Sequence, residues 1–346
     1  MRSYLLYTNA GAPSPSRQVD FPLPDSLPNP SPSQIESIQM RAGGTLPNTP
    51  PPMRISSEGI NNLKLMAFTG LSEVAFFDEL LRNITTNVQG YQVANAQERD
   101  MVIKSLTTFL AQAELQTIAE NNGLRRFNLN TVQPCHYSFP VSDYKSAIAL
   151  GEAFTSLKLG ALQDIVTRFA MGSDFDLARF ATSIAGQKGQ QSGWFRTLQN
   201  KVASGVPFPT MGNVDFLFSA VQRFIVPGNC SSIADISLRT LQPLNILTPP
   251  SPRTQLIRVS WKPTKGGKQG QLWMTYINQL NMPIAERMNI ISSNNETVVA
   301  EALFPYERRL LNGLTIAAVT TSGGPFANAA EVSQATAFGP GLISVN

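Results

Sequence analysis

Histidine is nearly absent from this 346-residue chain, and cysteine is scarce. His136 is the single histidine, which excludes zinc sites with several histidine ligands, two-histidine facial triads and paired Glu-x-x-His motifs. Cys135 and Cys230 are the two cysteines, so iron–sulfur clusters and four-cysteine zinc sites are excluded as well. His136 directly follows Cys135 in a loop flanked by prolines, where neighbouring side chains point apart. We therefore expect a loop histidine rather than a Cys-His nucleophile pair.

Charged residues are also few. They make up 14% of the chain, against roughly 25% in an average soluble protein, which argues against a disordered polyelectrolyte or a long solvated coiled coil. The net charge is +4 and the basic residues form no dense block, so we expect no nucleic-acid partner. No run reaches the roughly eighteen apolar residues of a membrane-spanning helix, and we expect no membrane span. The 42% of hydrophobic residues still suffices for a sizeable core.

Proline is concentrated at the beginning of the chain. Residues 1–55 contain eleven of the 25 prolines. Such a segment can neither donate enough backbone hydrogen bonds nor bury enough apolar area to fold alone. We predict an extended arm that wraps the rest of the chain.

Residues 56–250 have the apolar spacing of helices. Four segments of comparable length show it, at 59–87, 96–122, 142–171 and 173–202, and a shorter helix is expected at 214–224. The longest connection, at 128–140, separates the second helix from the third. Four long helices with one longer central connection predict a ferritin-like four-helix bundle with one additional helix.

After Pro252 the apolar period falls to two. Alternating residues predict strands at 256–261, 272–277, 297–304 and 314–320, and Gly266-Gly267-Lys268 predicts that the first two form a hairpin. We therefore predict a small antiparallel β domain over 251–346. The expected fold class is mainly α, with the bundle followed by this β domain.

Four short motifs resemble the fungal ferritin-like family of late sexual development and stress-response proteins. They are AQAEL at 111–115, CHYSFP at 135–140, GQQSGWFR at 189–196 and GPGLI at 339–343. The resemblance runs from about Ile60 to the C-terminus. It implies a ferritin-like bundle with a C-terminal β extension in a protein that is usually exported and glycosylated, and it implies no known reaction.

A ferritin-like bundle raises the question of a di-metal centre. Such a centre needs a Glu from each of two helices and a Glu-x-x-His from each of the other two. Carboxylates for the single positions are supplied by Glu73, Glu79 and Glu152. The Glu and His positions hold Ala113 and Gln116 on the second helix, and Lys188 and Gln191 on the fourth. Because an amide is a poor ligand and an ammonium repels a cation, we expect no metal and no other cofactor.

Two uses of the bundle interior then remain open. In the first, the polar side chains satisfy one another in a filled core, as in a structural protein: Glu73, Glu114, Gln116, Glu152, Gln187 and Gln191. In the second, the vacated centre binds a small organic ligand through Glu73, Gln116, Gln187, Gln191 and Trp194, with Phe77, Phe154 and Phe195 as further lining. Burial would then make Glu114 or Glu152 a proton donor.

These alternatives predict two classes of function. The first is a non-catalytic secreted protein associated with development or stress, or a small-molecule-binding protein. The second is a metal-independent cyclase or isomerase of fungal secondary metabolism, with Glu114 or Glu152 as the catalytic acid. The sequence indicates no oligomeric state.

Export is the expected localisation. Cys135 and Cys230 fall in loops that a ferritin-like bundle brings to one end, and in a secretory context they would form a disulfide. Glycosylation sequons begin at Asn83, Asn229 and Asn295. The apolar stretch after Arg2 is too short for a signal peptide, so the signal is missing or trimmed. A cytoplasmic protein with two free thiols is the alternative.

Overall fold

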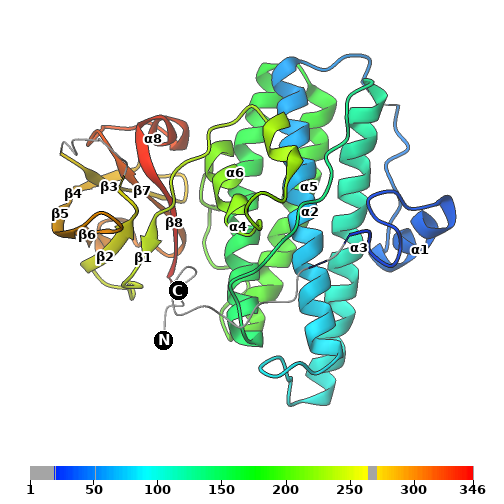
Figure 1. Ribbon diagram of the computed structural model, residues 1–346, viewed down its shortest axis with the longest axis horizontal. Coiled ribbons are helices and arrows are strands. Elements are labelled where there is room, and N and C mark those ends of the chain that lie inside the picture. The colour runs from blue at the N-terminus through cyan, green and yellow to red at the C-terminus, as the bar shows by residue number, and fades with distance from the viewer. Residues whose placement is uncertain (1–18, 20, 51, 264–270, 346) are drawn as a thin grey trace.

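The computed structural model describes residue 19 and residues 21–50, 52–263 and 271–345. Within these residues, long helices fill one part of the molecule, and two antiparallel sheets of four strands each form a smaller part beside it (Figure 1). The sequence prediction of a helical part followed by a C-terminal β domain is confirmed at this level.

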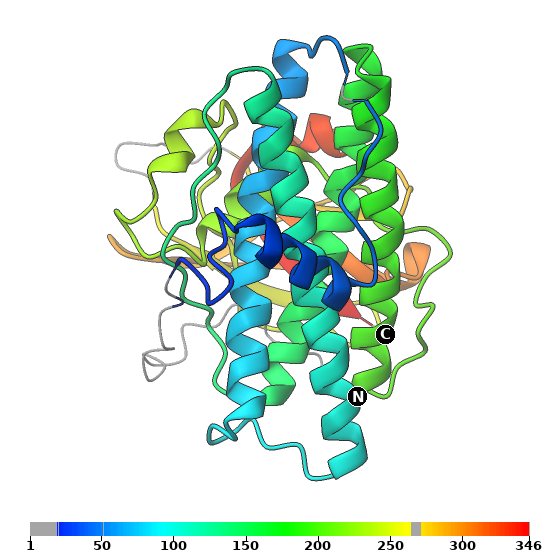
Figure 2. The same cartoon turned by 90° about the vertical axis from the view of Figure 1, so that its right-hand side faces the viewer.

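Four long helices lie side by side in the helical part (Figures 1 and 2). They are α2 (Ser57–Thr85), α3 (Ala96–Arg126), α4 (Tyr144–Met171) and α5 (Phe175–Leu198). Helix α2 packs against α3 and α4, and α4 packs against α5. Side-chain caps fix three of their starts, because Ser56, Asn95 and Asp143 each accept a hydrogen bond from a backbone N–H of the first turn. The shorter α6 (Val214–Gln222) also forms where it was expected.

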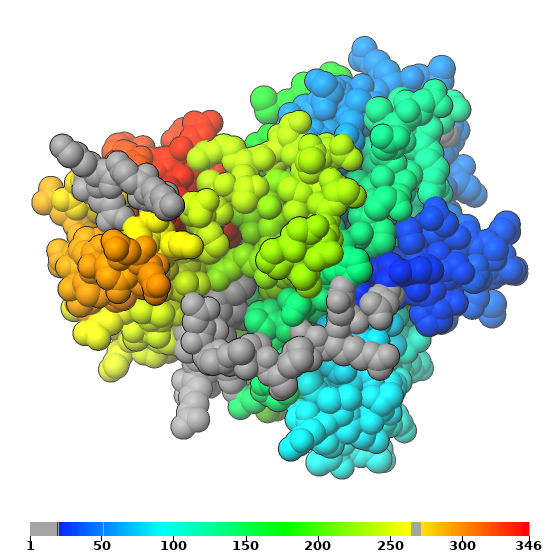
Figure 3. All heavy atoms as spheres, viewed as in Figure 1, coloured from blue at the N-terminus to red at the C-terminus, as the bar shows by residue number. Residues whose placement is uncertain are grey.

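The proline-rich segment contains a helix that the sequence analysis missed. We predicted an extended arm, but residues Pro32–Ala42 form α1, so the prediction is wrong for this stretch. Ser31 and Gln34 form a reciprocal capping box, and Pro32 occupies the first helical position, where its missing N–H costs nothing. Gly43 ends the helix with a φ of 71°. Helix α1 packs on α3, and its surroundings form a lobe at the edge of the molecule (Figure 3).

The β part forms a sandwich. One sheet has the order β1-β2-β6-β5 and the other has β4-β3-β7-β8. The strands are β1 (Asn245–Ile246), β2 (Gln255–Trp261), β3 (Trp273–Asn278), β4 (Ile284–Arg287), β5 (Asn289–Ser293), β6 (Val298–Phe304), β7 (Gly313–Thr320) and β8 (Thr336–Val345). The described residues also include the short helices α7 (Tyr306–Arg309) and α8 (Ala329–Ala335) and a 3-10 turn, η1 (Ser231–Asp235).

The predicted hairpin between the first two long strands is wrong. Strand β2 pairs with β1 and β6, whereas β3 pairs with β4 and β7 in the other sheet. The expected turn at 266–268 lies outside the described residues. The alternation of apolar and polar residues shows which face of a strand is buried, but it does not determine which strand lies beside it. Here all seven residues of β2 pair with β6, which is distant in the sequence.

Two cores hold the molecule together. The larger core continues from the helices onto one face of the β3-β7-β8 sheet through Ile277, Leu314 and Ile316. The smaller core fills the space between the two sheets and includes Trp261 and Tyr276. Strand β7 is therefore buried along its whole length. None of the helices among the described residues combines the length and the apolar character that a membrane span requires.

Candidate functional site

The middle of the four long helices holds a buried carboxylate between two lysines. Glu73 of α2 accepts hydrogen bonds from both: Lys158 Nζ of α4 lies 2.7 Å from Oε2, and Lys188 Nζ of α5 lies 2.6 Å from Oε1. The side chains of all three residues are at most 2% exposed. Lys188 Nζ also lies 3.2 Å from Gln191 Oε1, one turn further along α5. The carboxylate of Glu73 therefore links three helices through two ammonium groups.

The two lysines determine the charge state of Glu73. Burial alone would raise the pKa of Glu73, but the charges and hydrogen bonds of Lys158 and Lys188 outweigh it and hold the pKa below its ordinary value. Burial lowers the pKa of Lys188 to about 8, with Glu73 opposing this shift and Lys158 adding to it. Near neutral pH Glu73 is therefore ionised, and Lys188 remains mostly protonated.

Helix α3 adds a second carboxyl group to this centre. Glu120 is 1% exposed, and burial raises its pKa to about 8 despite the attraction of the two lysines. Its Oε2 and the Oγ1 of Thr117 have no hydrogen-bond partner among the described residues. Both atoms lie close to Gly70 of α2, where an added Cβ would stand 2.5 Å from Thr117 Oγ1 and 3.1 Å from Glu120 Oε2. Glycine at position 70 thus allows α2 and α3 to approach here.

These residues do not fit a pair of metal ions. A di-metal site needs anionic or neutral ligands turned toward the cations, whereas Lys158 and Lys188 place two ammonium groups against the carboxylate. In the part of the chain that the structure describes, no three His, Cys, Asp or Glu side chains are grouped so that they could hold a metal ion.

Glu114, one of the two candidate catalytic acids, lies elsewhere, beneath the segment around α1. Arg41 Nη2 stands 2.7 Å from Asp25 Oδ2 and 3.5 Å from Glu114 Oε2. Burial, followed by the charge of Asp25, raises the pKa of Glu114 to about 9. Glu114 is therefore a neutral acid at pH 7, in contact with the N-terminal segment through Arg41.

Glu152 of α4 is the other candidate acid, and both of its carboxylate oxygens accept hydrogen bonds from side chains near the end of α5. Its Oε1 accepts from Arg196 Nη1 at 3.0 Å, and its Oε2 accepts from Gln199 Nε2 at 2.8 Å and from Lys201 Nζ at 2.7 Å. The polar residues that we expected to satisfy one another are thus divided among separate clusters. The buried Glu73 and Glu152 pair mainly with basic side chains instead.

The predicted amide and aromatic ligands form two further groups between α3 and α5. Gln187 Nε2 donates to Gln112 Oε1 at 2.7 Å, and Gln116 Nε2 lies 3.5 Å from Gln187 Oε1. Trp194 packs edge-on against Phe109, with ring centroids 5.0 Å apart. Of the five predicted ligand residues, only Glu73 and Gln191 reach the cluster around Lys188.

The remaining predicted aromatic residues lie in the core. Phe77 stacks with Phe195, with ring centroids 6.3 Å apart. Phe154 packs edge-on against Phe224 of the segment that follows α6. All four rings are buried, so they contribute to the packing of the helical part.

Glu79 borders a cavity of about 10 Å³, the size of one water molecule. Its Oε2 is buried and has no hydrogen-bond partner among the described residues. Burial raises the pKa of Glu79 to about 7. Tyr91 and Asn83 also line this cavity.

A much larger space lies where the helical and β parts meet. It has a volume of about 750 Å³ and is lined by the beginning of α2, the C-terminal half of α4, residues 211–212 and the beginning of α8 at 328–330. We call this space the junction groove. Neither Glu114 nor Glu152 lines it or the small cavity beside Glu79.

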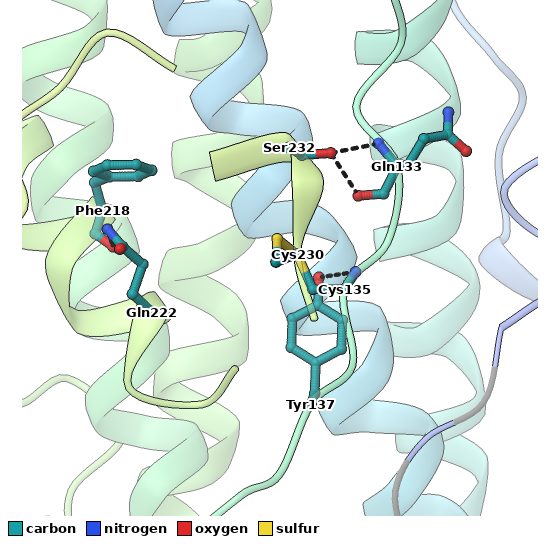
Figure 4. The surroundings of a disulfide bond; sticks show 7 residues. All are labelled: Gln133, Cys135, Tyr137, Phe218, Gln222, Cys230 and Ser232. Atoms are coloured by element: carbon teal, nitrogen blue, oxygen red, sulfur yellow. Dashed lines mark hydrogen bonds between the residues drawn. A yellow bond between two sulfur atoms is a disulfide. The ribbon is translucent and has the colours of Figure 1, made fainter. Parts of the chain in front are cut away.

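The expected disulfide is present between Cys135 and Cys230 (Figure 4). It joins the loop between α3 and α4 to the segment after α6. Ser232 Oγ strengthens this connection by accepting from the backbone N–H of Gln133 and donating to its carbonyl oxygen, both at 3.0 Å. The backbone N–H of Cys135 donates to Tyr137 Oη at 3.4 Å.

The three sequons differ in accessibility. Asn229 and Asn295 are exposed, next to the disulfide and between β5 and β6 respectively. Asn83 is half-buried inside α2, where a helical backbone does not suit a glycosylation acceptor. Two of the three sites are therefore accessible to modification.

Sequence reasoning missed Lys158, Thr117 and Glu120. We aligned the di-metal positions of α3 with Ala113 and Gln116, but the α3 residues beside the cluster of Glu73 are Thr117 and Glu120, one turn further along. Lys158 carried a usable signal, because it interrupts an otherwise apolar helical face four residues after Phe154. No family model and no curated protein matches the chain.

Proposed function

We propose that the protein belongs to the fungal ferritin-like family that it resembles, and that it is a non-catalytic, secreted protein of development or stress response. In this proposal α2–α5 form a ferritin-like four-helix bundle. Buried ion pairs hold the centre of the bundle closed, at the place where di-metal carboxylate proteins hold their metal ions.

The contact that carries the proposal is the carboxylate of Glu73 between Lys158 and Lys188. In di-metal bundles, single ligand positions on two helices and pairs spaced i, i+3 on the other two helices lie at one level. Here the single positions are Glu73 and Lys158. The spaced pairs are Thr117 with Glu120 and Lys188 with Gln191.

Physical chemistry explains how lysines can replace metal ions at such a place. A buried carboxylate needs positive charge and hydrogen-bond donors, and an ammonium group supplies both. Unlike a metal, the ammonium is covalently attached to its helix, so the connection between helices does not depend on metal supply. In a centre of this kind, loss of one charged partner would leave the other charge buried without compensation, and there is no open coordination position for a substrate.

Export is supported by separate observations. The disulfide between Cys135 and Cys230 is typical of oxidising compartments, and the sequons at Asn229 and Asn295 are exposed. Small-molecule binding is supported as a second role by the junction groove, which has the volume of a ligand site. The alternative of a metal-independent enzyme that uses Glu114 or Glu152 gains no support from the contacts of these two residues.

Elemental analysis tests the proposal. The protein is produced through a secretory route, purified without chelator, and analysed before and after incubation with Fe²⁺ or Mn²⁺. We expect no stoichiometric metal in either sample. Binding of about two equivalents per chain, lost together in Glu73→Ala but retained in the surface control Glu36→Ala, would contradict the proposal.

A further inference from the structure

The junction groove has an excess of negative charge. Its lining includes three charged side chains, Glu58, Asp164 and Arg168. Arg168 Nη1 lies 2.6 Å from Glu58 Oε1, and Arg168 Nε lies 3.1 Å from Asp164 Oδ2. Because the other lining residues are uncharged, two carboxylates face one guanidinium. A cation entering the groove would therefore be attracted, and an anion would meet both carboxylates.

Asp164 is held in place by a set of hydrogen bonds. Its Oδ2 accepts from Arg168 Nε, from Asn213 Nδ2 and from the backbone N–H of Val214, each at 3.1 Å. Its Oδ1 has no hydrogen bond to the described residues, so one acceptor position is free on an otherwise fixed carboxylate. Fixed acceptors lower the cost of ordering a site when a ligand binds.

Glu58 supplies the second acceptor. Its side chain is 46% exposed at the beginning of α2, and Oε1 is the oxygen that pairs with Arg168. The other oxygen has no hydrogen bond to the residues that the structure describes. The guanidinium of Arg168 thus pairs with both carboxylates, while each carboxylate keeps one oxygen without a hydrogen bond to any described residue.

Apolar groups complete the lining. Met171 is 83% exposed, and Met211, Ala329 and Ala330 also contribute to the groove. Thioether side chains adapt to ligands of different shape. The volume of about 750 Å³ exceeds what a small inorganic cation needs and lies within the range of drug-sized ligands.

We infer that the junction groove binds a small amphiphilic organic cation, whose amine pairs with Glu58 and Asp164 and whose apolar body lies against Met171 and Met211. This inference rests on the proposed ligand-binding role of the groove and does not depend on the nature of the bundle centre. It also places the ligand site at the junction between the helical and β parts, away from the bundle interior considered from the sequence.

Fluorescence titration of the full, disulfide-bonded chain tests this inference. The probe is dansylcadaverine, a dansyl group with a protonated amine, and the matched probe is dansyl-6-aminohexanoate, which carries a carboxylate instead. We expect saturable binding of the cationic probe, at least about 5-fold tighter than that of the anionic probe at low salt and weaker at high salt. Equal binding of both probes, preference for the anion, or no saturable binding would overturn the inference.

Three variants locate the binding. Glu58→Gln removes the excess negative charge of the groove and should weaken the binding of the cationic probe about 5-fold. Ala330→Trp places a bulky side chain in the groove and should abolish saturable binding. Glu36→Gln makes the same charge change on the exposed side of α1 and should leave binding unchanged. Unchanged binding in Glu58→Gln, which is conservative enough to fold, would show that the probe binds elsewhere.

Discussion

Lys188 Nζ lies 2.6 Å from Glu73 Oε1 at a place where the side chains of both residues are at most 1% exposed. Removing one partner of such a pair leaves a buried charge with too few partners, so Lys188→Met should destabilise the protein by about 3 kcal/mol in urea unfolding. Lys104→Met, on the exposed side of α3, should change stability by less than about 0.5 kcal/mol. Equal effects of the two substitutions would show that the pair does not support the fold.

The contact between α2 and α3 at Gly70 gives a second prediction. A Cβ at this position would stand 2.5 Å from Thr117 Oγ1, so Gly70→Ala should destabilise the protein by about 1–3 kcal/mol. The double variant Gly70→Ala/Thr117→Ala removes the atom that clashes and should recover much of the loss. Additive effects of the two substitutions in thermal unfolding would exclude this contact as the cause.

Glu120 should make stability depend on pH. Its pKa of about 8 in the folded protein lies above the ordinary value of 4.5, so between these values the folded state holds a proton that the unfolded state has released. Stability should therefore fall as pH rises from about 5 to 8, by up to about 1.4 kcal/mol per pH unit for this group.

The contribution of Glu120 can be isolated by substitution. Glu79 and Glu114 also have raised pKa values, so only the difference between variants assigns the effect. Glu120→Gln should reduce the slope of stability against pH, and Glu36→Gln should leave it unchanged. Identical slopes for the wild type and Glu120→Gln would mean that Glu120 is ionised at neutral pH.

The disulfide should contribute strongly to stability. Cys135 and Cys230 are 95 residues apart. A cross-link over that separation restricts the unfolded chain and should stabilise the folded protein by about 4 kcal/mol. Titration of unfolded, unreduced protein from a secretory host should find no free thiol. The double variant Cys135→Ser/Cys230→Ser should unfold at a lower urea concentration, and an unchanged midpoint would argue against this role.

The sequence predicted the positions of the long helices better than it predicted which strands pair with each other. Periodicity placed α2–α5 within a few residues because it depends on neighbouring positions along one helix. It missed β8, in which the Gly339-Pro340-Gly341 stretch has no alternation and the pairing with β7 defines the strand. It also missed the separation of β2 and β3 into different sheets, which depends on β6.

For the candidate sites, too, the sequence indicated the residues but not the contacts between segments that are distant in the chain. Glu73 and Lys188 could be identified from their types and helices, but their direct contact depends on how each helix is rotated about its axis. A shift of one turn along α3 exchanges Gln116 for Glu120 at the centre, and spacing alone does not determine that shift. The junction groove could not be predicted at all, because its lining comes from four separate segments.

The most direct test of the central claim is the ¹H–¹⁵N NMR spectrum of the lysine ammonium groups at about pH 6, well below the Lys188 pKa of about 8. Two buried, hydrogen-bonded ammonium groups should give two signals that exchange slowly with water. One signal should disappear in Lys158→Met and the other in Lys188→Met, and neither should change when Mn²⁺ is added. If the spectrum shows no protected ammonium signal, or if added metal removes the signals at stoichiometric concentration, lysine ion pairs do not occupy the centre of the helices.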